Sequence, residues 1–210
     1  MDQTLPKGLV PENREEQAQE NFEKALALLR PHFPDVDTTK IVFKKMAGND
    51  VGKAHHSGVE IDPIMLMHPV ARLAHILAHE LTHLDADTDS EGLVEAYLVR
   101  IGLKDESGEM TEQYNVALND FYKVADVIGP DRDNGTDTIY EHYKNEDYEE
   151  IYQKFIENGG DTEVFWAVFP ELYYDDDGET SARPLIDDEE DELIGIEARV
   201  EERVTDVKNS

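Results

Sequence analysis

Residues 69–84 constrain the fold more than any other part of this 210-residue chain. Their apolar members recur at helical spacing, which predicts an amphipathic helix with one face in a core. That apolar face consists of Val70, Leu73, Leu77, Leu81 and Leu84. A second face carries His75, His79 and His83 at four-residue intervals. The helix is therefore expected to be buried on one side and open on the side of the histidines.

The segment His79-Glu80-Leu81-Thr82-His83 gives that second face a chemistry. Two histidines four residues apart on a helix can each bring one imidazole nitrogen to the same metal ion. Glu80 projects beside such an ion, where a carboxylate can take a proton from water and later deliver it to a leaving amine. The pattern predicts Zn²⁺ as cofactor, His79 and His83 as ligands, and Glu80 as the catalytic general base.

A catalytic zinc usually takes three protein ligands and keeps one position for water. Asp89 lies six residues beyond His83, and Glu91 and Glu95 belong to a second predicted helix. If the two helices form a tight antiparallel hairpin, Glu91 stands near the level of His83 and Glu95 near that of His79. The spacing alone leaves Glu91, Glu95 and Asp89 open as the third ligand.

At this point the chain resembles the gluzincin zinc metallopeptidases, which join an HExxH helix to a second helix with a glutamate ligand. Glu91-Gly92-Leu93-Val94-Glu95 looks like that second helix, and the resemblance covers residues 69–100. It implies that Glu91 is the third ligand and that Glu95 orients a ligand histidine. It also implies a zincin-like core, in which an edge strand before the active helix binds the peptide substrate. Residues 58–62 hold that place in the sequence.

Periodicity and breaker residues predict the remaining elements, which together give an α+β fold that is mostly helical with a short sheet. The helix at 69–84 is expected to have Pro69 as its first residue. A solvated turn is expected at 131–137, in preference to a calcium loop. The other expected elements are helices at 11–30, 91–101, 109–128, 139–158 and 162–174, and strands at 39–46 and 56–62.

The amino-acid composition limits which classes of partner and which cellular compartment are expected. The formal net charge of −30 disfavours nucleic acid and anionic membrane surfaces as partners. The chain has no cysteine, so a disulfide framework is excluded, and no apolar stretch is long enough for a membrane span. These features predict a cytoplasmic protein. Residues 1–174 are expected to form one domain and 175–210 an acidic, flexible tail with a short helix, able to bind a basic protein partner.

Two functions follow from these observations. The first is zinc-dependent hydrolysis of peptide bonds in a peptide or protein substrate, with Glu80 as general base and an oxyanion donor among Tyr97, Tyr114, Tyr140 and His142. The second is a non-catalytic, metal-stabilised binding or regulatory module that acts through its acidic surface and tail. His75 is expected at the rim of the site or in a structural role.

Overall fold

The computed structural model describes residues 5–35, 37–48, 50–104 and 112–172. The fold is mostly helical with one small mixed sheet, which confirms the expected α+β class. The expectations for the tail at 175–210 lie outside the described residues. Within those residues, no helix combines the length and the apolar character that crossing a membrane requires.

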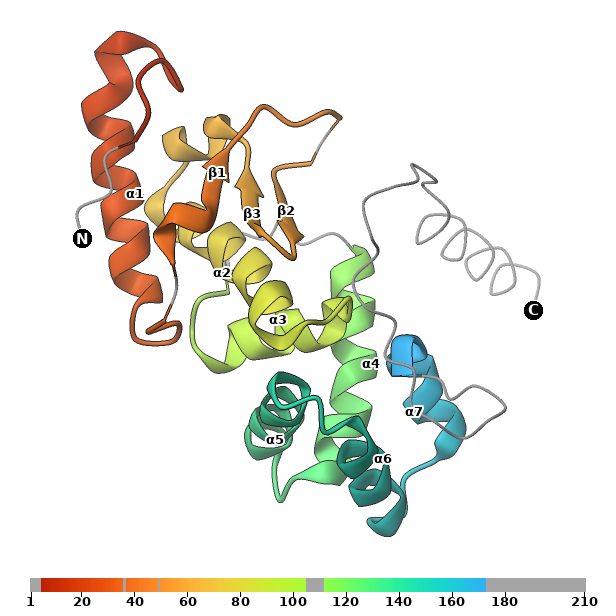
Figure 1. The fold of residues 1–210 in the computed structure, drawn as a ribbon. Helices are drawn as coiled ribbons and strands as arrows, with labels where there is room; N and C mark the ends of the chain where they lie inside the picture. The colour runs from red at the N-terminus through yellow and green to blue at the C-terminus, as the bar shows by residue number, and fades with distance from the viewer. Residues whose placement is uncertain (1–4, 36, 49, 105–111, 173–210) are drawn as a thin grey trace.

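Helices α2 and α3 lie at the centre of the molecule, and the other helices surround them (Figure 1). The α-helices are α1 (Glu15–Leu29), α2 (Val70–Ala86), α3 (Glu91–Arg100), α4 (Glu112–Ile128), α5 (Arg132–Lys144), α6 (Tyr148–Glu157) and α7 (Thr162–Val168). Short 3₁₀ helices are η1 (Glu12–Arg14), η2 (Thr38–Lys40), η3 (Pro63–Met67) and η4 (Pro170–Leu172).

The sheet has three strands in the order β1-β3-β2, with β1 at Ile41–Phe43, β2 at Gly52–His55 and β3 at Gly58–Ile61. Strand β3 is central: it pairs parallel with β1 and antiparallel with β2. The expected edge strand at 58–62 is therefore an inner strand, and that expectation was wrong. Strand β2 was not predicted, because Gly-Lys-Ala-His lacks the alternation of β-branched residues that marks a strand.

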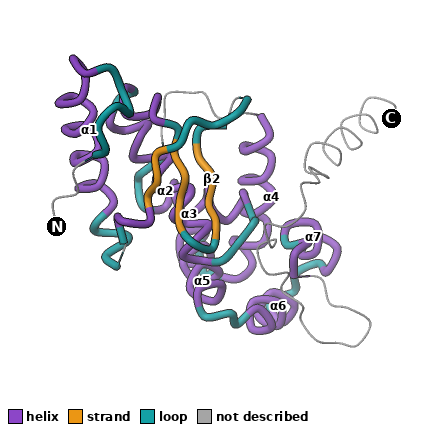
Figure 2. The backbone as a smooth tube through the Cα atoms, turned by 45° about the horizontal axis from the view of Figure 1, so that its top comes forward, coloured by secondary structure: helices purple, strands orange, loops and turns teal. Residues whose placement is uncertain are grey.

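Two hydrophobic clusters fill the interior, and α3 belongs to both. The first cluster joins α1, the sheet, η3 and α2, and Val94 and Leu98 of α3 contribute to it. The second joins α4, α5, α6 and α7, and Leu93 and Ala96 of α3 contribute to that one. Figure 2 shows α2 and α3 behind the sheet, with α5 and α6 farther from it. Helix α3 thus contributes apolar residues to both clusters, and its acidic residues Glu91 and Glu95 face the histidines of α2.

Several elements differ from the expected ones; for example, α7 ends at Val168 and not at residue 174. Pro69 is the N-cap of α2 and not its first residue. The helix expected at 139–158 is two helices, because the chain turns at Glu146, whose φ of 58° no helix accommodates. The expected solvated turn at 131–137 is the start of α5: the Asp131 side chain accepts a hydrogen bond from the backbone N–H of Asn134 and caps the helix.

Candidate metal centre and active site

A short turn brings α2 and α3 together as the antiparallel hairpin that the sequence predicts. Helix α2 ends at Ala86 because Asp87 takes a left-handed conformation, with φ at 45°. Ser90 then caps α3 by accepting a hydrogen bond from the N–H of Leu93. Only residues 87–90 separate the helices. The first turn of α3, which carries Glu91, therefore lies beside the last turns of α2, which carry His79 and His83.

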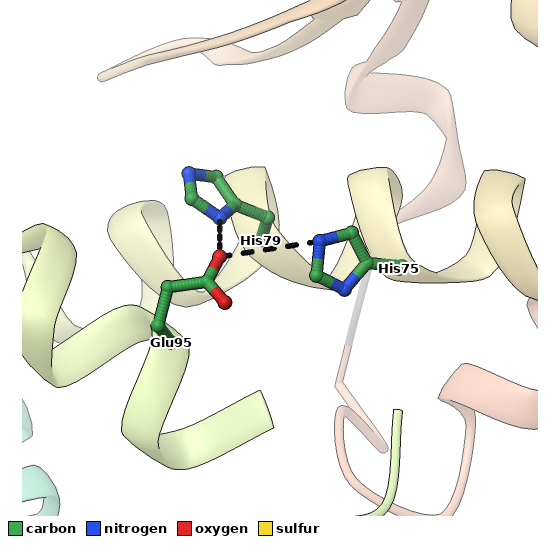
Figure 3. A group of neighbouring side chains, drawn as sticks. All are labelled: His75, His79 and Glu95. Atoms are coloured by element: carbon green, nitrogen blue, oxygen red, sulfur yellow. Dashed lines mark hydrogen bonds and ion pairs between the residues drawn. The ribbon is translucent and has the colours of Figure 1, made fainter. Parts of the chain in front are cut away.

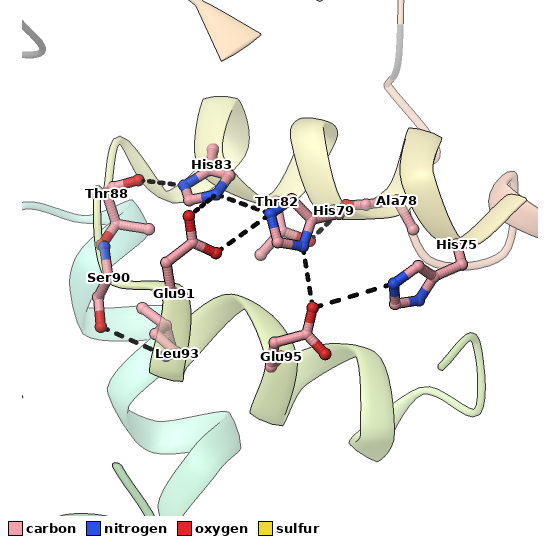
Figure 4. Close-up of polar contacts among 10 residues, drawn as sticks. All are labelled: His75, Ala78, His79, Thr82, His83, Thr88, Ser90, Glu91, Leu93 and Glu95. Carbon is pink, nitrogen blue, oxygen red and sulfur yellow. Dashed lines mark hydrogen bonds and ion pairs between the residues drawn. The ribbon is translucent and has the colours of Figure 1, made fainter. Parts of the chain in front are cut away.

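His79, His83 and Glu91 converge across this hairpin (Figure 4). The two Nε2 atoms of the histidines lie 3.2 Å apart. Glu91 Oε2 lies 3.2 Å from His79 Nε2, and Glu91 Oε1 lies 3.7 Å from His83 Nε2. Two ligands on one tetrahedral zinc ion are about 3.3 Å apart, because each bond to the ion is ~2.0–2.1 Å long. The distances between the ligand atoms of the three side chains are therefore close to those in a tetrahedral zinc site.

The other nitrogen of each imidazole is held by the surrounding chain. His83 Nδ1 donates to the backbone carbonyl of Thr88 at 2.6 Å, inside the turn that joins the helices. His79 Nδ1 contacts Glu95 Oε1 at 3.0 Å, and the Glu95 side chain is only 1% exposed. Partners of this kind fix the ring orientation and leave Nε2 as the free ligand atom. Both Nε2 atoms therefore face Glu91.

Electrostatics favour a cation between these residues. Burial acts to lower the pKa of His79, but contacts with the Glu91 and Glu95 carboxylates outweigh it and raise the pKa to about 10. Burial acts to raise the pKa of Glu91, yet the two histidines hold that pKa well below its usual range. Glu91 Oε2 is buried and has no hydrogen-bond partner among the described residues. A positive ion in this place would supply the missing partner.

Glu80 lies between this cluster and the edge strand β2. Burial is the main cause that raises the pKa of its carboxyl, and the backbone N–H of Ala54 donates a hydrogen bond to it. The strand can approach so closely because residue 52 is glycine: a Cβ there would stand 2.5 Å from Glu80 Oε1. A carboxylate with a raised pKa is a stronger base than an exposed one. The structure thus holds Glu80 in one place and strengthens it as a base.

Gly52→Ala is therefore expected to destabilise the fold through the clash with Glu80. Overpacking of this kind lowers the free energy of unfolding by about 1–3 kcal/mol. In a Glu80→Ala background the clash is gone, and the same change should stabilise by about 0.5 kcal/mol by restricting the unfolded chain. Urea unfolding of the four proteins of this cycle measures both values. The same effect of Gly52→Ala in both backgrounds would show that Gly52 makes no room for Glu80.

Of the remaining candidates for a metal ligand or an oxyanion donor, Tyr114 lies beside the histidines and Asp89 lies outside the ligand group. Asp89 is exposed and belongs to none of the groups of potential metal ligands found among the described residues. Tyr114, near the start of α4, lies with its ring centroid 5.7 Å from that of His79. Burial, followed by the charges of Glu91 and Glu80, raises the pKa of Tyr114 and keeps its hydroxyl protonated.

The other three oxyanion candidates lie elsewhere. Tyr97 stacks on Tyr140 with 3.7 Å between ring centroids, and the Tyr140 hydroxyl donates to Asp85. His142 faces Glu150 at 3.5 Å on the surface formed by α5 and α6. Tyr114 is thus the candidate donor that the fold brings to the histidines.

Tyr114 reaches His79 because α3 and α4 pack very closely. A Cβ on Gly92 would lie 2.6 Å from the backbone oxygen of Ala117, so a larger residue would push α4 away. Sequence reasoning did not identify Gly52, Thr88 or Gly92 as residues of the site. The glycine in Glu91-Gly92-Leu93, inside a predicted helix, was a signal for a close approach. Thr88 acts through its backbone carbonyl, which no side-chain pattern reveals.

Comparisons of this chain with protein-family models, with curated proteins and with solved structures found no match.

Proposed function

We propose that this chain is a zinc-dependent metallopeptidase of gluzincin type with a zincin-like core. The observation that carries the proposal is the convergence of His79, His83 and Glu91 at tetrahedral spacing, with the buried Glu80 beside them. Three protein ligands leave one coordination position open, as a catalytic zinc site requires. In this assignment Glu95 orients His79, and Thr88 orients His83.

Bound between these ligands, zinc supplies a Lewis acid that polarises a carbonyl group and makes water more acidic. Glu80 takes a proton from the attacking water and delivers it to the leaving amine nitrogen. Its hydrogen bond from Ala54 and its contact with Gly52 hold the carboxylate in place for both transfers. The Tyr114 hydroxyl stays protonated, and it donates a hydrogen bond to the oxygen that gains negative charge during the attack.

Strand β2 offers an edge on which an extended peptide can be held. Val51 O accepts from the N–H of Asp62, the residue after β3, so the peptide groups of Gly52 and Ala54 point to the opposite edge. Among the described residues, no strand pairs with that edge. A substrate strand adds to such an edge through main-chain hydrogen bonds. Because Glu80 takes the N–H of Ala54, the carbonyl groups and the N–H of Gly52 remain for the substrate.

Metal analysis followed by a peptide-library cleavage assay tests the proposal. The purified protein is expected to bind about one zinc ion, held by His79, His83 and Glu91. It should cleave peptides, lose activity with a chelator and regain it with zinc. A chain that binds zinc and cleaves no peptide would be a metal-stabilised binding module instead.

Tyr114→Phe tests the oxyanion donor. Removing one such donor costs ~10²-fold in kcat, and KM should change little because the hydroxyl acts in the transition state. Tyr122→Phe is the matched control on the same helix, since its ring packs against Arg132 and not against His79. Equal kcat values in both variants would remove Tyr114 from the mechanism.

A further inference from the structure

The two helices carry their ligand residues twice, at the same spacing. His75 and His79 stand four residues apart on α2, as do His79 and His83, and Glu91 and Glu95 stand four residues apart on α3. His75, His79 and Glu95 therefore form a copy of the first group, displaced by one helical turn (Figure 3). All three side chains of this second group are buried. His79 is common to both groups, with Nε2 facing one and Nδ1 the other.

The second group holds an unsatisfied carboxylate. Glu95 is only 1% exposed, and its buried Oε2 has no hydrogen-bond partner among the described residues. Glu95 Oε1 lies 3.0 Å from His79 Nδ1 and 3.9 Å from His75 Nε2. The ligand atoms of the three residues all lie within 4.8 Å of one another. An unsatisfied buried carboxylate beside two imidazoles is a favourable place for a divalent cation.

We propose that His75, His79 and Glu95 form a second position for a divalent transition-metal ion, one helical turn from the first. The distance from His75 Nε2 to Glu95 Oε1 exceeds a tetrahedral zinc edge by about 0.6 Å, so the His75 ring would have to move by that amount to bind the ion. No residue of this second group other than His79 takes part in the first group.

The two positions are alternatives for a single ion. A neutral imidazole has one lone pair, because one of its two nitrogens carries the proton. His79 binds an ion through Nε2 in the first position, while Nδ1–H donates to Glu95. In the second position it binds through Nδ1. The first position lies closer to tetrahedral spacing, so it fills first. If the proposed hydrolysis holds, an ion in the second position is out of reach of Glu91 and His83, and the chain is inactive.

Metal titration of a His83→Gln/Glu91→Gln variant tests the inference without any activity assay. Both changes keep the size of the side chain approximately, and circular dichroism checks the fold. Titration with Zn²⁺ is expected to show one ion bound, with affinity lowered by at least 10²-fold. Adding His75→Ala should reduce that residual affinity by a further ~10-fold or more. In the wild-type chain, His75→Ala should leave the affinity nearly unchanged.

The nitrogen that binds the ion gives a second readout. With ¹¹³Cd²⁺ as probe and ¹⁵N-labelled histidine, the wild-type chain should show coupling of the metal to Nε2 of His79. The His83→Gln/Glu91→Gln variant should show coupling to Nδ1. Residual binding that His75→Ala does not weaken, or coupling that stays on Nε2 in the variant, would overturn the second position. Either result would leave the hydrolytic proposal for the first position intact, and a failure of hydrolysis would leave this result unaffected.

Discussion

Glu80→Gln is expected to lower kcat for peptide cleavage by about 10²–10⁴-fold, the share that general acid-base catalysis supplies. Glutamine keeps the size of the side chain and can still accept the hydrogen bond from Ala54, but it cannot take a proton from water. Glu80 is not among the converging ligands, so the zinc content should stay at the wild-type level. Cleavage rates measured beside metal analysis give both values.

Glu60→Gln is the control for this prediction. Glu60 lies on the central strand β3, pairs with Lys44 and His55, and belongs to none of the groups of potential metal ligands among the described residues. Its replacement should change neither cleavage nor zinc content. Full activity of Glu80→Gln would reject Glu80 as the base, and loss of zinc from the variant would show that Glu80 is a ligand.

Glu91→Gln is expected to remove most of the stabilisation that zinc gives. A ligand present at about 1,000 times its Kd stabilises the folded state by ~4 kcal/mol. For a chain of this length, that corresponds to a rise in Tm of about 10 °C. The variant loses a charged ligand that touches both His79 and His83, so the rise in Tm on adding zinc should nearly disappear. Thermal unfolding with and without zinc measures it.

Two neighbouring acids serve as comparisons in the same experiment. Asp89→Asn should keep the full zinc-induced rise in Tm, because Asp89 is exposed and lies outside the ligand group. Glu95→Gln should weaken zinc binding by about 10- to 100-fold, as expected for a residue that orients a ligand. If Asp89→Asn, and not Glu91→Gln, removed the rise in Tm, Asp89 would be the third ligand.

The helix pair was predictable because its signals are local. Histidine spacing, the Ser90 cap and the short turn are all contained in residues 69–100, and together they determine which side chains face each other. The convergence of His79 and His83 with Glu91 follows from the helical rise and the length of that turn. The exposed position of Asp89 did not follow, because it depends on the backbone of the turn, in which Asp87 is left-handed and the Thr88 carbonyl contacts His83.

The sheet was predicted less well because pairing is not local. Strand β2 forms through its pairing with β3 and its packing on α2, and its own four residues have little strand propensity. Its Gly52 and Ala54 looked like parts of a loop in the sequence, yet they determine the position of Glu80. Similarly, Tyr114 could not be ranked above Tyr97 or Tyr140, because the crossing of α3 and α4 at Gly92 decides which of them reaches His79.

Helix α3 takes part in both hydrophobic clusters, so an ion bound by the proposed ligands would affect the stability of both. Val94 and Leu98 anchor the helix to the cluster around α2, while Leu93 and Ala96 anchor it to the cluster around α4 and α5. The side chain of Glu91 extends from α3 and contacts His79 and His83 of α2. An ion held by all three would link the two clusters, so that neither could unfold without releasing it. Metal binding would then make the unfolding of the two clusters a single cooperative event.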